Sequence, residues 1–104
     1  AIGTLRAAVA VQDALPYMEP EHWYLPVRLC LAAALLRAAG DAAGAAAEYE
    51  EDLRQHPHSG WALLGLREAR RALGDDAGAS ALQARVDAAF ARADTALDGT
   101  CCEL

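Results

Sequence analysis

Two stretches of the chain, residues 37–47 (RAAGDAAGAAA) and residues 71–81 (RALGDDAGASA), are close copies of each other. Eight of their eleven positions match at an offset of 34 residues. Abundant alanine raises the number of chance matches, but the shared arginine, the Gly-Asp pair and the second glycine are not alanine. Similarity at a fixed period is the sequence signature of repeat architectures. The chain is therefore predicted to contain two copies of one structural unit.

Each copy is predicted to be a helix, a Gly-Asp turn and a second helix. In the first copy Gly40 ends the first helix, because glycine readily adopts the left-handed conformation that follows a last helical turn. Asp41 is a good N-cap for the second helix, and Pro57 ends that helix because proline lacks the N–H that would continue it. The predicted inner positions are Leu29, Ala32, Ala33 and Leu36 on the first helix and Ala45, Tyr49 and Leu53 on the second.

The second copy begins near Ser59 or Gly60 and repeats the turn at Gly74 and Asp75. Nothing between residues 76 and 97 forces its last helix to stop, so we expect this helix to run for about 20 residues. The second copy is also more polar than the first, as the terminal unit of a stack of repeats needs to be. Arg70, Gln83 and Asp87 stand where the first copy has Leu36, Tyr49 and Leu53. The apolar stripe of its last helix comprises Ala79, Leu82, Val86, Phe90, Ala93 and Leu97.

Composition supports an all-α fold in one domain. Alanine supplies 27 and leucine 15 of the 104 residues. These two residues favour helices, whereas the β-branched and aromatic residues that favour strands are scarce. We expect about five helices in antiparallel hairpins. Residues 1–20 would hold a lone helix from Thr4 to Leu15, 21–58 the first repeat, 59–97 the second repeat with a long C-terminal capping helix, and 98–104 a tail.

The 34-residue helix–turn–helix unit resembles the tetratricopeptide repeat. The resemblance rests on small residues eight places before and five places after the glycine of the turn, on a large aromatic residue and on a closing proline. It covers about residues 26–97, and residues 19–97 are similar to the C-terminal repeat region of large bacterial proteins of this family. Because the chain begins with Ala1, we expect it to be part of such a longer protein. The residues that carry the resemblance are Ala32, Gly40, Ala45, Tyr49 and Pro57, and Leu66, Gly74 and Ala79 in the second copy.

The resemblance implies a non-catalytic scaffold for protein–protein interaction. In this family the first helix of each pair lines a concave groove that binds an extended or helical peptide. The lysine and asparagine pattern that holds C-terminal carboxylates in chaperone-binding members is absent, because this chain has neither residue. The groove residues implied here are Val27, Cys30, Ala34 and Arg37 from the first copy and Trp61, Leu64, Glu68 and Arg71 from the second.

Arg37 and Arg71 lie one repeat apart and allow two interpretations. They could bind a carboxylate of the partner together, since guanidinium groups form strong paired hydrogen bonds with carboxylates. Alternatively, each arginine complements the dipole at the C-terminal end of its own helix and stays solvated.

Charge and cysteine content limit the partners. A net charge of −6 argues against a nucleic-acid surface, which would be basic. No uncharged apolar run is long enough to span a membrane. The three cysteines are Cys30, Cys101 and Cys102, an odd number in which the last two are adjacent, so no secreted disulfide framework is expected. We therefore predict reduced thiols, an incidental tail and a cytoplasmic location.

Other candidate sites favour structural interpretations. His56 and His58 could chelate a metal, but without further ligands at suitable spacing a solvated turn between repeats is favoured. The acidic residues Glu48, Glu50, Glu51 and Asp52 are predicted to form a solvated helix face rather than a general acid–base pair. Trp23 and Tyr24 are expected to fill packing gaps, and Trp61 suits either packing or a partner. We expect no catalytic residues, metal or cofactor.

Two alternatives to a peptide-binding scaffold remain open. An exposed apolar N-terminal edge would pair two chains, which makes the unit a homodimerisation module. A metal-binding or enzymatic unit would instead use His56, His58 and the thiols of the tail.

Overall fold

The computed structural model of the chain describes residues 1–16, 18–19, 25–97 and 102. This part of the chain contains five helices and no strand, as the composition predicts. The helices are α1 (Ile2–Asp13), α2 (Val27–Arg37), α3 (Ala42–Gln55), α4 (Gly60–Ala72) and α5 (Asp76–Ala89).

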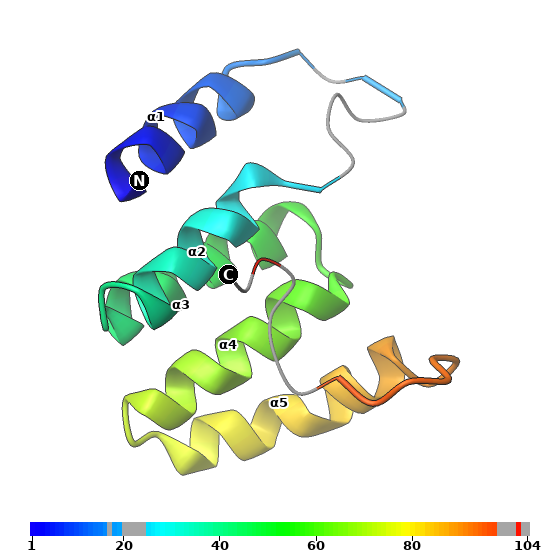
Figure 1. Cartoon of the computed structure of the whole chain (residues 1–104). Helices are drawn as coiled ribbons and strands as arrows, with labels where there is room; N and C mark the ends of the chain where they lie inside the picture. The colour runs from blue at the N-terminus through cyan, green and yellow to red at the C-terminus, as the bar shows by residue number, and fades with distance from the viewer. Residues whose placement is uncertain (17, 20–24, 98–101, 103–104) are drawn as a thin grey trace.

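The helices pack in the order of the sequence, each against the next (Figure 1). In addition, α2 contacts α4, so the first helices of the two copies are neighbours. Small side chains permit this close packing, because Ala32, Ala45, Ala62 and Ala69 are all fully buried. Tyr49 of α3 is the largest fully buried side chain. The abundance of alanine is thus partly architectural, since alanine lines the contacts between helices.

The turn between α2 and α3 and the turn between α4 and α5 have the same geometry, as the repeat predicts. Gly40 and Gly74 adopt positive φ angles of 65° and 76°. Side chains with a Cβ rarely adopt this left-handed conformation. Both turns then begin their second helix with a capping aspartate.

The two capping aspartates explain the second glycine of each copy. Asp41 Oδ1 accepts a hydrogen bond from the backbone N–H of Gly44 (2.8 Å), and Asp75 Oδ1 accepts one from Gly78 (2.9 Å). A Cβ on Gly44 would lie 2.3 Å from Asp41 Oδ2, and a Cβ on Gly78 would lie 2.1 Å from Asp75 Oδ2. Glycine at the third helical position therefore lets the capping carboxylate approach closely.

Two predicted helix bounds are wrong. The last helix ends at Ala89 instead of continuing to Leu97. The first helix begins at Ile2, so Thr4 lies inside it and is not its N-cap. Beyond Phe90 the apolar stripe of α5 has no helix to pack against, because α4 begins at Gly60 and its Trp61 already contacts the Phe90 ring. Residues 91–97 are accordingly exposed.

Candidate functional site

The groove predicted from the repeats corresponds to neighbouring positions on α2 and α4, which we name the α2–α4 face. Arg37 and Arg71 are exposed in the last turns of the two helices, and Leu64 is buried with 1% of its surface accessible. The half-buried members of the α2–α4 face are Val27, Cys30 and Ala34 on α2 and Trp61 and Glu68 on α4.

Arg71 is engaged within its own helix. Its Nη1 donates a hydrogen bond to Glu68 Oε1 at 2.8 Å, and the same carboxylate forms an ion pair with Arg67 at 3.0 Å. A carboxylate of a partner would therefore compete with Glu68 for Arg71. This geometry favours a role for Arg71 within its own helix over a shared role with Arg37 in binding a carboxylate of a partner.

Trp61 has a packing role in this arrangement. Its ring meets the ring of Phe90 edge to face, with centroids 5.8 Å apart and planes at 72°. Aromatic pairs prefer such offset or T-shaped geometries. Trp61 thus joins the start of α4 to the end of α5. Trp23 and Tyr24 lie outside the described residues.

The end of the chain returns to the α2–α4 face. A separate cavity of about 450 Å³ lies between α4, α5 and residues 93–97, and its helical lining residues are Leu64, Arg67, Gln83, Val86, Asp87 and Phe90. Farther along, Cys102 is joined to Cys30 of α2 by a disulfide, with their Cα atoms 5.1 Å apart. Cys30 and Cys102, which are 72 residues apart in sequence, are therefore held together at this face.

This disulfide corrects the prediction of reduced thiols. The odd cysteine count and the adjacent pair Cys101-Cys102 argued against a disulfide framework, but they did not exclude one long-range bond. Cys30 and Cys102 are 72 residues apart in sequence. The pairing depends on where the end of the chain lies, which the repeat pattern does not reveal. Cys102 is consequently not part of an incidental tail, whereas Cys101 lies outside the described residues.

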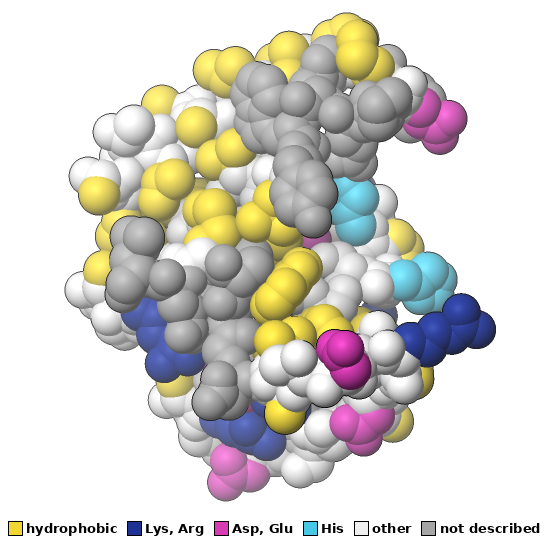
Figure 2. All heavy atoms as spheres, turned by 45° about the vertical axis from the view of Figure 1, so that its right-hand side comes forward, with side chains coloured by type: hydrophobic (Ala, Val, Ile, Leu, Met, Phe, Trp, Pro, Cys, Tyr) yellow, Lys and Arg dark blue, Asp and Glu magenta, His cyan; other side chains and the backbone are white. Residues whose placement is uncertain are grey.

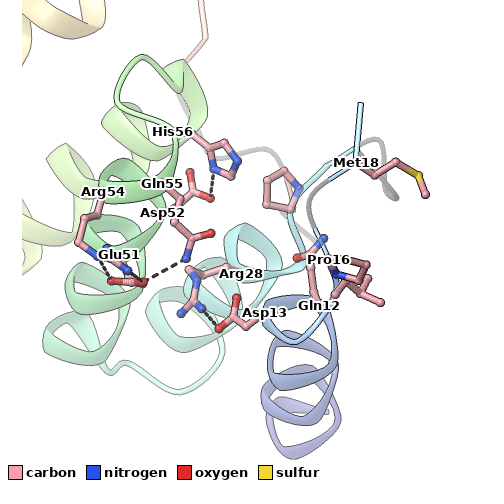
Figure 3. A pocket seen from close by; sticks show the side chains of 12 residues that line it. Gln12, Asp13, Pro16, Met18, Arg28, Glu51, Asp52, Arg54, Gln55 and His56 are labelled. Carbon is pink, nitrogen blue, oxygen red and sulfur yellow. Dashed lines mark hydrogen bonds and ion pairs between the residues drawn. The ribbon is translucent and has the colours of Figure 1, made fainter. Parts of the chain in front are cut away.

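A second, polar groove lies between the end of α1, the start of α2 and the end of α3. Its volume is about 550 Å³, and Figure 2 shows the molecule hollowed on this side, with histidine side chains near the hollow. Figure 3 shows that charged side chains line it on the α3 side and that Pro16 and Met18 lie on the α1 side. Its ionisable members are Asp13, Arg28, Glu51, Asp52, Arg54 and His56.

Arg28 connects three helices at this groove. Its guanidinium, on α2, donates through Nη2 to Asp13 on α1 and through Nη1 to Glu48 Oε2 on α3 (2.5 Å). Only 9% of the Arg28 surface is exposed. Burial alone would lower the pKa of Arg28, but the hydrogen bonds and charges of the two carboxylates raise it above its usual value. Arg28 therefore stays charged and neutralises two carboxylates.

Asp52 and His56 form a second polar pair, at the end of α3. Asp52 is 1% exposed and its Oδ1 lies 3.1 Å from His56 Nδ1 (Figure 3). Within the described part of the chain, its Oδ2 has no hydrogen-bond partner. Burial raises the pKa of Asp52, while the nearby His56, Ser59 and Arg28 partly offset that rise. Burial therefore disfavours the charged form of this carboxyl group, which lies at the turn that leads into α4.

The prediction that the acidic residues of α3 form a solvated face is wrong for Asp52, which is buried. For the other acidic residues the prediction is incomplete, because they also bind arginine side chains. Glu48 binds Arg28, and Glu50 Oε1 accepts a hydrogen bond from Arg70 of α4 at 2.9 Å. Hydrogen bonds from Arg54 and Gln55 lower the pKa of the half-buried Glu51 to about 2. The acidic run therefore links α3 to α2 and α4 as well as facing solvent.

The described residues contain no group of three side chains suited to a metal ion. His58 is exposed, and His56 is directed to Asp52. In the turn between α3 and α4, one histidine therefore contacts a buried carboxylate and the other faces solvent. In the same part of the chain, no helix has the length and apolar character required to cross a bilayer.

Sequence reasoning missed Arg28 and Asp13. The signal was present, since Arg28 is the one charged residue in the apolar segment from Leu25 to Leu36. A lone arginine in such a segment indicates either a buried ion pair or an exposed helix edge. The distinction requires the position of α1, which carries Asp13. No family model, curated protein or solved structure matches the chain.

Proposed function

We propose that the chain is a non-catalytic protein-interaction module that binds an extended polypeptide segment on the α2–α4 face. The observation that carries this proposal is intramolecular. Cys102, from the C-terminal part of the chain, is joined to Cys30 of this face by a disulfide. This face therefore already holds a residue from a distant, non-helical part of the chain, which supports a polypeptide as its partner.

Two further features support a tetratricopeptide-like arrangement within this proposal. The hairpins α2–α3 and α4–α5 share the same glycine and aspartate geometry at their turns. In addition, α2 contacts α4 directly, as the first helices of successive repeats do in a stack of helix pairs. We propose that the module belongs to a longer, cytoplasmic bacterial protein and binds neither nucleic acid nor a membrane.

A peptide library tests the proposal. The chain, kept reduced by dithiothreitol, would be used to select binding peptides, and the selected peptides would be measured against two variants. Ala34→Arg places a large charge on the α2–α4 face and should weaken binding at least tenfold. Ala47→Arg, on the exposed side of α3, is the matched control and should bind like the original chain. Equal binding by both variants would place the peptide elsewhere and contradict the proposal.

Self-association is the second candidate. One observation favours it, because Val11 of α1 is 60% exposed and Met18, beyond that helix, is 49% exposed. Exposed apolar side chains at one edge of a fold favour contact with another chain. Val11→Glu should then convert a dimer to a monomer in light scattering. A concentration-independent monomer of the original chain would eliminate this candidate.

A further inference from the structure

The polar groove between α1, α2 and α3 contains a buried carboxyl group with an unused hydrogen-bonding position. Asp52 lines the groove and is 1% exposed. Its Oδ1 lies 3.1 Å from His56 Nδ1, whereas its Oδ2 finds no hydrogen-bond partner among the described residues. A buried polar atom without a partner costs free energy, because its hydrogen bonds to water have not been replaced. An atom of this kind at a groove indicates a place for a ligand that donates a hydrogen bond.

The other carboxylates that line the groove already have arginine partners. Arg28 binds Asp13, and Arg54 binds Glu51. The partner of Asp52 is a histidine instead, which carries a positive charge only when it is protonated. Among the described residues that line the groove, Asp52 is therefore the carboxylate without an arginine in hydrogen-bonding contact. A ligand that completes the charge balance of the groove carries a positive charge.

The side of the groove next to α1 can hold an apolar chain. Met18 lies there with 49% of its surface exposed, and Figure 3 shows Pro16 and Met18 on this side, across from the charged side chains of α3. The volume of about 550 Å³ suits a small ligand. The groove therefore combines an apolar side with one unsatisfied carboxyl group. Its apolar lining residues are Leu15, Pro16, Met18 and Pro26.

We propose that the polar groove binds a primary alkylammonium group, with the ammonium at Asp52 Oδ2 and the alkyl chain against Pro16 and Met18. An ammonium is a compact cation, so one free carboxylate oxygen is enough to receive it. A guanidinium binds best through two parallel hydrogen bonds to both oxygens of a carboxylate, and Oδ1 of Asp52 already contacts His56. The site shares no residue with the α2–α4 face and does not depend on the proposed function.

Binding requires a local shift of the Asp52 carboxyl group, because its Oδ2 is enclosed. The last torsion of an aspartate side chain is broad, so the carboxyl group can turn without a movement of the backbone. Burial raises the pKa of Asp52 and disfavours its charged form. A bound ammonium favours the charged form. The pKa of Asp52 should therefore fall when the ligand binds.

Titration of the whole labelled chain with pentylamine, followed by nuclear magnetic resonance, tests the site. At pH 7 the amine is an ammonium, since alkyl amino groups have a pKa of about 10. The carboxyl carbon of Asp52 should shift, and its pKa should be lower with saturating amine than without it. An intermolecular Overhauser effect should connect the pentyl chain to the methyl group of Met18. An Asp52 carboxyl carbon that does not respond to the amine would overturn the proposal.

Two matched variants assign the binding to one carboxylate. Asp52→Asn removes the charge with little change of shape and should weaken pentylamine binding about tenfold or more, as the loss of a hydrogen bond to a charged group does. Glu51→Gln removes a carboxylate that Arg54 already neutralises, so its affinity should stay within about twofold of the original. Equal losses in the two variants would reveal general charge attraction and contradict the proposal. If Asp52→Asn does not fold, the carboxyl-carbon titration of the original chain decides.

Two further ligands define the chemistry of the site. Pentylguanidinium should bind about fivefold more weakly than pentylamine, because Asp52 offers one free oxygen. Equal affinities would overturn the selection of an ammonium. A blocked peptide of glycine, lysine and glycine then distinguishes the source of the ammonium. If the peptide shifts the Asp52 carboxyl carbon as pentylamine does, the site accepts a lysine side chain, and if only pentylamine does so, the site binds a free amine.

Discussion

At the scale of single residues, the tight core depends on one glycine that the repeat pattern does not single out. Gly65 of α4 is buried, and a Cβ built on it would lie 2.2 Å from the ring of Tyr49. Tyr49 is fully buried on α3. The tyrosine can therefore lie between α3 and α4 only because residue 65 has no side chain. The sequence predicts Tyr49 as an inner residue, but the glycine that accommodates it is recognised only when the two helices are placed together.

This contact predicts the effect of Gly65→Ala. In an exposed helix, glycine to alanine normally stabilises by about 0.5–1 kcal/mol. Here the added methyl must displace the Tyr49 ring, and overfilling a packed core costs about 1–3 kcal/mol. Gly65→Ala should therefore lower the free energy of unfolding, measured in urea. The control is Gly3→Ala on α1, where the added Cβ meets nothing within 4 Å. If both variants were equally stabilised, the contact with Tyr49 would be unimportant.

Asp52 predicts a specific dependence of stability on pH. Burial raises the pKa of Asp52 above its ordinary value of 3.8 in the folded chain. The folded chain therefore binds this proton more tightly than the unfolded chain, and the contribution to stability is fully present below pH 3.8 and is lost as the pH rises through the folded pKa. Asp52→Asn should remove this pH-dependent loss of stability. The original chain should therefore become less stable relative to the variant as the pH rises from 3.8 through the folded pKa of Asp52. A carboxyl-carbon titration of Asp52 with a pKa below 3.8 would contradict this expectation.

At the scale of elements, sequence predicts the turns better than the ends of the outer helices. Gly40 and Gly74 mark turns through local backbone geometry, which depends on a few neighbouring residues. The end of α5 depends instead on what its apolar stripe can pack against. That stripe loses its neighbour beyond Phe90, so an unbroken pattern of apolar residues to Leu97 does not continue the helix. Periodicity indicates a face that could be buried, and tertiary contacts decide whether it is.

The cap of α5 gives a prediction that separates hydrogen bonding from charge. Asp75 accepts a hydrogen bond from the N–H of Gly78, and this bond, with Arg70, lowers the pKa of the carboxyl. Removal of a helix N-cap costs about 1 kcal/mol. Asp75→Ala should lose this stability at neutral pH, whereas Asp75→Asn should retain most of it because asparagine also caps well. Because the pKa of Asp75 is lowered, its ionic contribution is present above pH 3.8 and is lost as the pH falls below that value. Equal losses in both variants at pH 7 would show that the charge, not the cap, is important.

At the scale of the whole molecule, bonds between distant segments hold the outer elements to the central hairpins. Arg28 connects α1 to α3, and the Cys30–Cys102 disulfide connects the end of the chain to α2. Sequence predicted neither connection, because each depends on where segments outside the repeat period come to lie. The repeated unit was predictable from residues 37–47 and 71–81. The contacts of α1 and of Cys102 with α2 were not predictable from the sequence.

Arg28→Met should destabilise the chain through α1. The substitution leaves Asp13 and Glu48 without their shared cation, and hydrogen bonds to charged groups contribute about 1.5–3 kcal/mol. We expect the free energy of unfolding to fall by about this amount, with faster amide exchange in α1. Arg54→Met is the matched control, because the Arg54 side chain is 72% exposed in its ion pair with Glu51. Exposed pairs contribute about 0–1 kcal/mol. Similar losses in the two variants would contradict a connecting role for Arg28.

Reduction of the disulfide should lower the stability of the whole chain. The bond joins residues 72 positions apart, and closing a loop of that length removes unfolded-state entropy equivalent to about 4 kcal/mol. Domains are typically stable by only about 5–15 kcal/mol. Reduction should therefore shift the urea midpoint markedly, while the reduced chain stays folded in water. Cys101→Ser in the oxidised state should keep the midpoint of the original chain. Identical midpoints for the oxidised and reduced original chain would show that Cys30 and Cys102 are not bonded in solution, whereas a chain unfolded on reduction would show that the fold requires the disulfide.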